Sequence, residues 1–259
     1  LERQKVVVII SDALRYECGV ELASEINSIS KFDAKLEMMI GVVPSYTQLG
    51  MAALLPHKRL SFDGKSDTVL TDGLSSMGSD NREKILQYNS QRAALTMQAR
   101  EFMQMKSAER RIAIRDNEIL YIYSNKIDKS GDDKMTENEV FEAVRLEIEE
   151  LRELVVAATS ANASRVLVTS DHGFIYQDSI VEESDYVETK FKGETFKENR
   201  RFVLGTKLIN DDDAMWFKAK DLMIESDVDV LIAKGINRFR VRGAGSRFVH
   251  GGASLQATI

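Results

Sequence analysis

The sequence predicts an α/β fold with a largely parallel sheet. Short apolar runs rich in β-branched residues recur along the chain, and segments with helical periodicity stand between them. The 259 residues contain two prolines and no visible repeat, so no clear linker divides them, and we expect a single domain over residues 1–259. Because the chain begins at Leu1 and stops after "HGGASLQATI", we expect it to be a fragment of a longer protein.

Four segments are expected to form strands. Continuous apolar runs of this length are typical of parallel strands that are buried on both faces. In chain order the segments are 5–11 ("KVVVIIS"), 34–43 ("AKLEMMIGVV"), 118–124 ("EILYIYS") and 164–170 ("SRVLVTS").

Three segments between these runs are expected to be helical: 16–27, 47–55 and 137–160. The last has apolar residues spaced so that they share one helix face, which indicates a long amphipathic helix. Residues 57–80, rich in Ser, Asp and Gly, are expected to be loop. The polar stretch 178–200 predicts no particular element.

The composition excludes some classes of protein. A net charge of -6 and a pI near 5.3 argue against tight, nonspecific binding of duplex nucleic acid through charge alone. The single cysteine, Cys18, excludes an internal disulfide framework and is typical of a reducing compartment. No apolar run approaches the roughly 20 residues of a membrane span, and no signal peptide is visible. We therefore expect a cytoplasmic protein without a membrane partner.

The ends of the expected strands carry polar residues that are able to do chemistry. In parallel α/β folds, ligands bind outside the carboxyl ends of the strands, so these positions are the first candidates for a site. In chain order they are Asp12, then Ser45 and Thr47, then Asp128 and Asp132, then Asp171 and His172, and finally His250. Two of the three histidines of the chain lie in this set.

This collection favours divalent metals. Carboxylates and imidazoles form the mixed oxygen and nitrogen shells that are typical of zinc or manganese. The set is larger than one four-coordinate site requires, which points to two metals about 4 Å apart that clamp the attacking and leaving oxygens of a phosphoryl transfer. Thr47, at the start of an expected helix, offers a hydroxyl nucleophile that a metal would activate.

Each candidate also has a purely structural interpretation. Asp12 and Thr47 are residue types that commonly cap helices. Ser45 competes with Thr47 as nucleophile, or binds phosphate instead. Arg15 lies one turn beyond Asp12 and either contacts the phosphate or forms a surface salt bridge. Residues 128–139 partly match a calcium-binding EF-hand loop, but Asp133 stands where that loop needs glycine.

Five motifs resemble those of the PglZ domain of phage-defence proteins, a branch of the alkaline phosphatase superfamily. They run from Val6 to Gln256 in the family's order: "DALRYE", "VPSYTQLGMAALLP", "SNKIDKSGD", "VTSDHGFIY" and "VHGGASLQ". The resemblance implies a doubly wound sheet with helices on both faces, and two metal ions. It implies a division of the ligands into Asp12, Asp171 and His172 for one metal, Asp128, Asp132 and His250 for the other, and Thr47 as the nucleophile that bridges both.

One position departs from the superfamily's usual pattern, which has a histidine where Asp132 stands. A further carboxylate makes the second site harder and more negative, so we expect zinc in this chain but consider manganese as an alternative. The arginines at 238, 240, 242 and 247 alternate close to His250 and either face a nucleic-acid backbone or lie solvated on an edge strand.

The resemblance and the candidate residues together predict a two-metal phosphodiesterase that acts on nucleic acid or nucleotides through a phospho-Thr47 intermediate. Two alternatives stay open: a phosphomonoesterase or phosphomutase on the same scaffold, and a scaffold subunit of a defence complex with little turnover. Partners among other phage-defence proteins follow from the resemblance.

Overall fold

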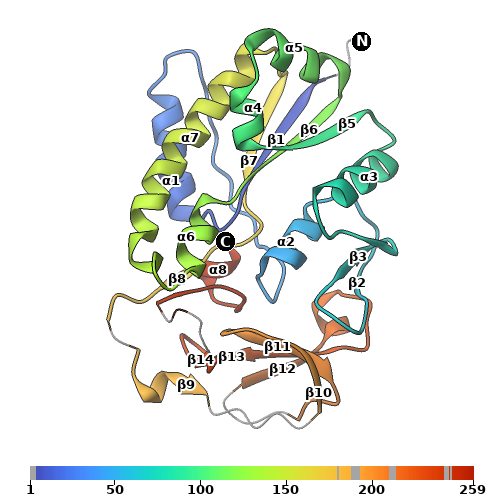
Figure 1. Ribbon diagram of the computed structural model, residues 1–259, viewed down its shortest axis with the longest axis vertical. Coiled ribbons are helices and arrows are strands. Elements are labelled where there is room, and N and C mark those ends of the chain that lie inside the picture. Colours follow the sequence, from blue (N-terminus) through green and yellow to red (C-terminus); the bar gives the residue numbers. More distant parts are fainter. Residues whose placement is uncertain (1–3, 180, 188–192, 210–213, 242–244, 246) are drawn as a thin grey trace.

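The protein is described by a computed structural model that covers residues 4–179, 181–187, 193–209, 214–241, 245 and 247–259. Its centre is a parallel four-stranded sheet in the order β5-β6-β1-β7 (Figure 1). The strands are β1 (Val6–Ser11), β5 (Ala94–Gln98), β6 (Ile119–Ser124) and β7 (Arg165–Thr169). Val6 of β1 lies opposite Ile119 of β6 and Arg165 of β7, so these three strands start and end level with one another.

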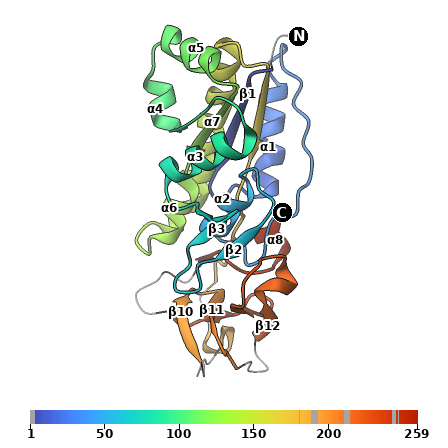
Figure 2. The same cartoon turned by 90° about the vertical axis from the view of Figure 1, so that its right-hand side faces the viewer.

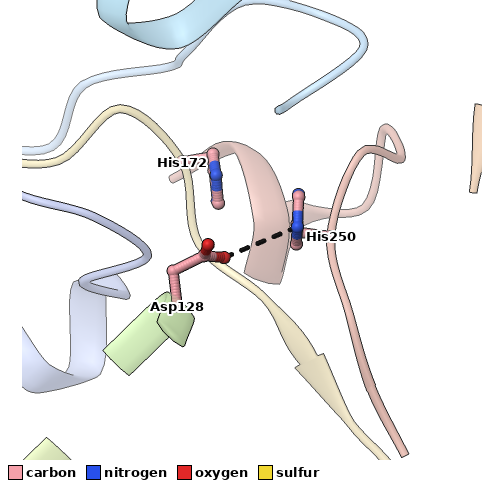
Figure 3. A group of neighbouring side chains, drawn as sticks. All are labelled: Asp128, His172 and His250. Atoms are coloured by element: carbon pink, nitrogen blue, oxygen red, sulfur yellow. Dashed lines mark ion pairs between the residues drawn. The ribbon is translucent and has the colours of Figure 1, made fainter. Parts of the chain in front are cut away.

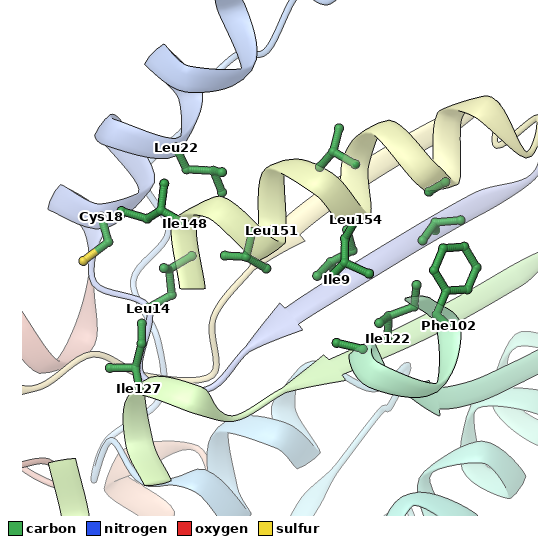
Figure 4. Close-up of a cluster of buried hydrophobic side chains, with 14 of the residues drawn as sticks. Ile9, Leu14, Cys18, Leu22, Phe102, Ile122, Ile127, Ile148, Leu151 and Leu154 are labelled. Carbon is green, nitrogen blue, oxygen red and sulfur yellow. The ribbon is translucent and has the colours of Figure 1, made fainter. Parts of the chain in front are cut away.

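Helices cover both faces of this sheet, as expected. On one face, α1 (Tyr16–Asn27) and α7 (Val140–Ser160) pack over Val7 and Ile9 of β1 (Figure 4). On the other face, Ile10 packs against α2 (Thr47–Ala53) and α3 (Ser79–Ser90). The alternation along β1 follows from the period of two of a β-strand, which sends successive side chains to opposite faces. Shorter helices complete this half: α4 (Ala99–Gln104), α5 (Ser107–Asp116), α6 (Lys126–Asp132) and the 3-10 turn Glu137–Glu139.

The second half of the chain adds an antiparallel sheet in the order β10-β11-β13-β12. Its strands are β10 (Glu194–Glu198), β11 (Phe202–Thr206), β12 (Ala214–Lys218) and β13 (Asp229–Ala233). Its apolar face packs against α2, where the rings of Tyr46 and Phe202 stack with their centroids 4.5 Å apart. Because α2 contacts both sheets, it is held between the two halves of the chain (Figures 1 and 2).

Several short elements border the two sheets. They are the antiparallel strands β2 (Leu60–Phe62), β3 (Val69–Thr71) and β4 (Leu74–Ser75); the pairs β8 (Ile175–Tyr176) with β15 (Phe248–Val249) and β9 (Tyr186–Val187) with β14 (Arg238–Phe239); the 3-10 turns Glu183–Asp185 and Ala219–Leu222; and α8 (Leu255–Thr258). No helix among the described residues combines the length and the apolar character that crossing a bilayer requires.

Two expectations about the elements are wrong. Residues 34–43, all of which are described, form an extended coil instead of a strand, with Ile40 71% exposed. The reason is that this segment pairs with no neighbouring strand: its backbone N–H at Gly41 donates to the carbonyl of Thr258, and that at Ala34 donates to the side chain of Asn27. Residues 57–80 are not simply loop, because they contain β2, β3 and β4 and the start of α3. Strand β5 was not anticipated.

Candidate metal centre

The candidate residues gather at the carboxyl ends of the central strands, which point toward the antiparallel sheet (Figure 1). Asp12 directly follows β1, and Asp171 follows the neighbouring strand β7. Because Ile10 and Thr169 are paired in a parallel register, the residues that follow them emerge side by side. The sheet topology alone therefore brings together residues that are far apart in the sequence.

A first group surrounds the imidazole of His172. Its Nε2 lies 3.3 Å from Oδ1 of Asp12, 3.6 Å from Oδ2 of Asp171 and 3.1 Å from Oγ1 of Thr47. Asp12, Asp171 and His172 are buried, and Thr47, the first residue of α2, is half-buried. Gly50 of α2 permits this approach, because a Cβ at that position would lie 2.3 Å from the carbonyl oxygen of Asp171.

A second group surrounds His250, which follows β15. Its Nε2 lies 3.5 Å from Oδ1 of Asp128 and 3.5 Å from Oδ2 of Asp132. The two carboxylates are four residues apart on α6, a spacing that puts side chains on one face of a helix. Gly131 lets β15 approach α6 closely, since a Cβ there would lie 2.4 Å from the ring of Phe248.

The two groups are adjacent to each other. The rings of His172 and His250 stack with their centroids 4.4 Å apart and an interplanar angle of 9°. Figure 3 shows Asp128 and the two imidazoles converging, and one ligand atom from each of these three residues lies within 4.8 Å of the others. The structure thus brings all seven expected residues into one continuous cluster: Asp12, Thr47, Asp128, Asp132, Asp171, His172 and His250.

The hydrogen bonds of His172 identify which of its nitrogens faces the group. Nδ1 lies 3.0 Å from the carbonyl oxygen of Gly173, and because a carbonyl only accepts, Nδ1 carries the proton. Nε2 of the neutral ring then presents its lone pair to Asp12, Asp171 and Thr47. The pKa of His172 is lowered to about 3, first by burial and then by the neighbouring His250, which keeps the ring neutral.

Burial also controls the acids of the first group. Desolvation, reinforced by the charge of Asp171, raises the pKa of Asp12 well above its usual range. Desolvation raises the pKa of Asp171 to about 7, against the opposing effect of the backbone N–H of Ala13, which lies 3.4 Å from its carboxylate. Two buried carboxylates this close resist ionising together unless a cation compensates them.

In the second group, neighbouring charges and hydrogen bonds oppose the effect of burial on the pKa values of Asp132 and His250. Desolvation raises the pKa of Asp128. Burial works in the same direction on Asp132, but its hydrogen bond with His250 and the guanidinium of Arg200 outweigh burial and lower its pKa to about 2. Burial lowers the pKa of His250, but the hydrogen bond to Asp132 and the charge of Asp128 reverse this effect, so the pKa is raised.

The cluster fits divalent cations. Among the described residues, Oδ1 of Asp12, Oδ1 of Asp128 and Oδ2 of Asp171 are buried without a hydrogen-bond partner. A buried polar atom that lacks a partner is costly, and a carboxylate oxygen more so. Carboxylate oxygens in this state, beside the unprotonated Nε2 of His172, have the donor chemistry that zinc or manganese accepts.

The two residues considered as substrate ligands do not join the cluster. The hydroxyl of Ser45, which is buried, donates to the carbonyl of Gly252 at 3.0 Å. Arg15 forms an ion pair with Glu17, and its guanidinium carbon lies 5.0 Å from the ring centre of Phe174. The contacts of Arg15 are therefore those of a surface salt bridge, and the hydroxyl of Ser45 is used in a hydrogen bond to the backbone.

The structure also bears on two further alternatives. The segment that partly matches an EF-hand loop begins inside α6, so it is not an ion-binding loop. The arginines near His250 differ in exposure: Arg238 is buried and donates to Gln177, whereas Arg240 is exposed and pairs with Glu183, and Arg247 is half-buried and donates to Asn138. Residue 242 lies outside the described residues.

Sequence reasoning missed two buried charges near the cluster. Glu147 of α7 accepts hydrogen bonds from the hydroxyls of Ser11 and Ser124, at the ends of β1 and β6. Glu147 could have been identified from the sequence, because it is an acidic residue on the apolar face of an amphipathic helix. Arg200 contacts Asp132 at 2.5 Å, and its signal was the pair of adjacent arginines directly before the apolar run of β11.

Comparison with known proteins now identifies the family. The family model described as the BREX system PglZ alkaline phosphatase-like domain matches residues 1–259. The chain belongs to the PglZ family. It is similar to the alkaline phosphatase-like protein BrxZ of Escherichia coli O9:H4 (strain HS), with 43% identity over 257 residues that make up 98% of this chain. It is also similar to the alkaline phosphatase-like protein PglZ of Bacillus cereus (strain H3081.97), with 36% identity over 260 residues and 100% of this chain.

The PglZ chain spans 29% and 30% of the lengths of these two relatives. Among solved structures it is similar to murine ectonucleotide pyrophosphatase/phosphodiesterase 5, with a TM-score of 0.61 and 12% identity over 98% of this chain and 86% of that one. The human protein of the same name gives a TM-score of 0.60 and 10% identity, with the same coverage of both chains. At this identity the likeness establishes the fold alone, and the family model describes this domain as alkaline phosphatase-like.

Proposed function

We propose that this PglZ chain is a two-metal-dependent phosphodiesterase that acts on nucleic acid or nucleotides with Thr47 as its nucleophile. The observation that carries the proposal is the position of one hydroxyl beside two adjacent groups of ligands. Thr47 Oγ1 lies 3.1 Å from Nε2 of His172, and the ring of His172 stacks on that of His250.

We divide the ligands between the metals as the family resemblance implies; by proximity His172 also lies with Asp128 and His250. Asp12, Asp171 and His172, with Thr47, would hold the first metal, and Asp128, Asp132 and His250 would hold the second. When bound, two such cations neutralise charge on the phosphoryl oxygens and make a hydroxyl nucleophilic near neutral pH. Zinc suits the imidazoles, while the excess of carboxylates also suits manganese.

The chain's own groups support attack by Thr47. Its hydroxyl hydrogen-bonds to the unprotonated Nε2 of His172, so the oxygen is already oriented toward the cluster. The competing hydroxyl of Ser45 is engaged with Gly252. In the proposed reaction Thr47 Oγ1 loses its proton and bonds to phosphorus while the bond from phosphorus to the leaving oxygen breaks, and the leaving alkoxide takes up a proton to depart as an alcohol. Water then cleaves the phosphothreonine and restores the hydroxyl.

A diester substrate is favoured by the neighbours of the fold. The similar murine protein is named as a phosphodiesterase, and a structure of an inactive variant of it is a complex with AMP. We extend this substrate class, a phosphodiester next to a nucleoside, to the PglZ chain. We also propose that the longer protein works in the cytoplasm with other proteins of a BREX phage-defence system, because the family model carries that system's name.

Hydrolysis of two chromogenic esters tests the proposal. Bis-p-nitrophenyl phosphate and p-nitrophenyl phosphate are compared with added zinc, with manganese and with chelator, and Thr47→Ala serves as the inactive control. We expect metal-dependent hydrolysis that favours the diester. Preference for the monoester would instead indicate a phosphomonoesterase or phosphomutase. No hydrolysis above the metal-only background would indicate a scaffold subunit, and equal hydrolysis by the chain and Thr47→Ala would show that Thr47 is not the nucleophile.

A further inference from the structure

Arg200 connects the antiparallel sheet to the second ligand group. It lies between β10 and β11, and its side chain is 8% exposed. Nη2 donates to Oδ1 of Asp132 at 2.5 Å, and Nη1 donates to the carbonyl oxygens of Phe248 at 2.8 Å and Gly245 at 3.0 Å. Since Phe248 precedes His250 by two residues, one guanidinium holds both the carboxylate on α6 and the strand that delivers the imidazole.

The contact leaves Asp132 ready to bind a cation. Arg200 takes Oδ1, whereas Oδ2 lies 3.5 Å from Nε2 of His250 and faces the cluster. Fixing one oxygen of a carboxylate in this way orients the other, as carboxylates that ligate metals are in turn held by hydrogen bonds. The first ligand group has no comparable charged partner among the described ion pairs, because Asp12 and Asp171 pair there with His172 alone.

Asp132 depends on this partner for physical reasons. It is the last residue of α6, where the negative end of the helix disfavours a carboxylate. Its side chain is 43% exposed, so packing alone does not hold its rotamer. The carboxylate in turn stabilises the buried guanidinium of Arg200, because an isolated buried charge is strongly unfavourable. The two residues therefore stabilise each other at the edge of the second group.

Arg201 shows that this contact is specific to one of two adjacent arginines. It is also buried, but its Nη2 donates to the carbonyl of Gly235 at 2.8 Å and its Nη1 donates to that of Asn237. Neither of these acceptors belongs to the cluster. The two arginines are thus similarly buried, but only Arg200 contacts a residue of the ligand cluster. Arg201 is therefore a matched control for the substitution of Arg200.

We propose that Arg200 is a positioning residue for the second metal. It holds Asp132 and β15 so that Oδ2 of Asp132 and Nε2 of His250 face one cation, and it binds neither the metal nor the substrate itself. This inference rests on the proposed two-metal function, because it assigns a partner to one of the two sites.

Stepwise zinc binding, measured by competition with a chromophoric chelator, tests the proposal. In Arg200→Gln we expect the second equivalent of zinc to bind about 10- to 100-fold more weakly and the first to bind unchanged. Arg201→Gln should leave both affinities unchanged. Arg200→Lys keeps the charge but lacks the planar fork that reaches the carboxylate and both carbonyls at once, so it should recover only part of the loss.

A double-mutant cycle shows whether Arg200 acts through Asp132. In the Asp132→Asn background, Arg200→Gln should weaken the second zinc by clearly less than it does in the unmodified chain, because only the contacts of Arg200 with β15 then remain to be lost. Equal losses with and without that carboxylate would overturn the positioning role, as would an unchanged second affinity in Arg200→Gln. If the unmodified chain binds a single zinc, the two-metal function fails together with this inference. If it binds two and the arginine variants do not differ, only the role of Arg200 fails.

Discussion

Oγ1 of Thr47 lies 3.1 Å from Nε2 of His172, although 125 positions separate the two residues. Thr47 begins α2, and His172 follows the edge strand β7. The two meet because Gly50 lets α2 lie directly on the backbone of Asp171. The packing of α2 therefore positions the hydroxyl, whereas the end of β7 positions the imidazole. A substitution that shifts α2 or β7 would move the two groups apart.

The nucleophile can be tested at this contact. Thr47→Ala removes the hydroxyl but no carboxylate or imidazole, so diester hydrolysis should fall by orders of magnitude while zinc content falls little. Thr47→Ser should keep part of the activity, because the chemistry needs the hydroxyl and the methyl group mainly restricts its rotamer. The control is Ser45→Ala, assayed at saturating metal. Near-normal turnover in Thr47→Ala with loss in Ser45→Ala would assign the nucleophile to Ser45 instead.

The metal ligands can be tested by stoichiometry. The unmodified chain, loaded with zinc and freed of excess, should approach two equivalents by elemental analysis. His172→Ala should bind less zinc and lose hydrolysis, while its circular dichroism stays near that of the unmodified chain, because the ring lies beyond the end of β7 and outside the apolar core clusters. Unfolding of this variant with unchanged metal content would instead mark His172 as a structural residue.

Gly50→Ala tests the close packing of α2. Alanine favours a helix over glycine by about 1 kcal/mol, but its Cβ would lie 2.3 Å from the carbonyl oxygen of Asp171. We expect the clash to prevail, with a loss of about 1–3 kcal/mol in the free energy of unfolding and a large loss of hydrolysis. Gly19→Ala on α1 is the control, since its Cβ would meet only the end of the flexible Leu36 side chain at 3.3 Å. Equal stability of the two variants in urea denaturation would contradict this view of the packing.

Glu147 predicts a pH dependence of stability. Burial raises its pKa in the folded chain, despite the hydrogen bonds from Ser11 and Ser124. A raised pKa means that the folded state holds the proton more tightly, so the contribution of Glu147 to stability is present below its unfolded pKa of about 4.3 and is lost as pH rises toward its folded pKa. Glu147→Gln, which cannot ionise, should therefore gain in Tm relative to the unmodified chain as pH rises from about 4 toward neutrality.

Calorimetry of the metal-free proteins across that range measures the effect. The control is Glu153→Gln, an exposed position on the same helix, whose Tm should run parallel to that of the unmodified chain. A difference between Glu147→Gln and the unmodified chain that does not change with pH would show that Glu147 titrates alike in the folded and unfolded states.

The local sequence was sufficient to predict the strands of the central sheet that are continuous apolar runs. The apolar runs that became β1 and β6 are buried between helices on both faces, and the expected helix 16–27 has the same bounds as α1. The run 164–170 also forms a strand, β7, but at the edge of the sheet it is only partly covered, with Leu167 55% exposed, so the expected burial on both faces is wrong there. The rule that ligands gather at the carboxyl ends of parallel strands then selected residues that do lie together. For Asp12 and Asp171 this succeeded because the sequence defines where their strands end and the sheet places those ends side by side. Thr47 follows a segment that forms no strand and reaches the cluster through α2 instead.

Tertiary structure decided everything that depends on a partner. Residues 34–43 are as apolar as a strand, yet without a paired neighbour they stay an extended coil, because a strand exists only through its ladder of hydrogen bonds. Arg15 and Arg200 look alike in the sequence, but one pairs with Glu17 and the other is buried against Asp132. The charge and donor chemistry of a side chain are written in the sequence, whereas the groups that it meets are determined by packing between distant segments.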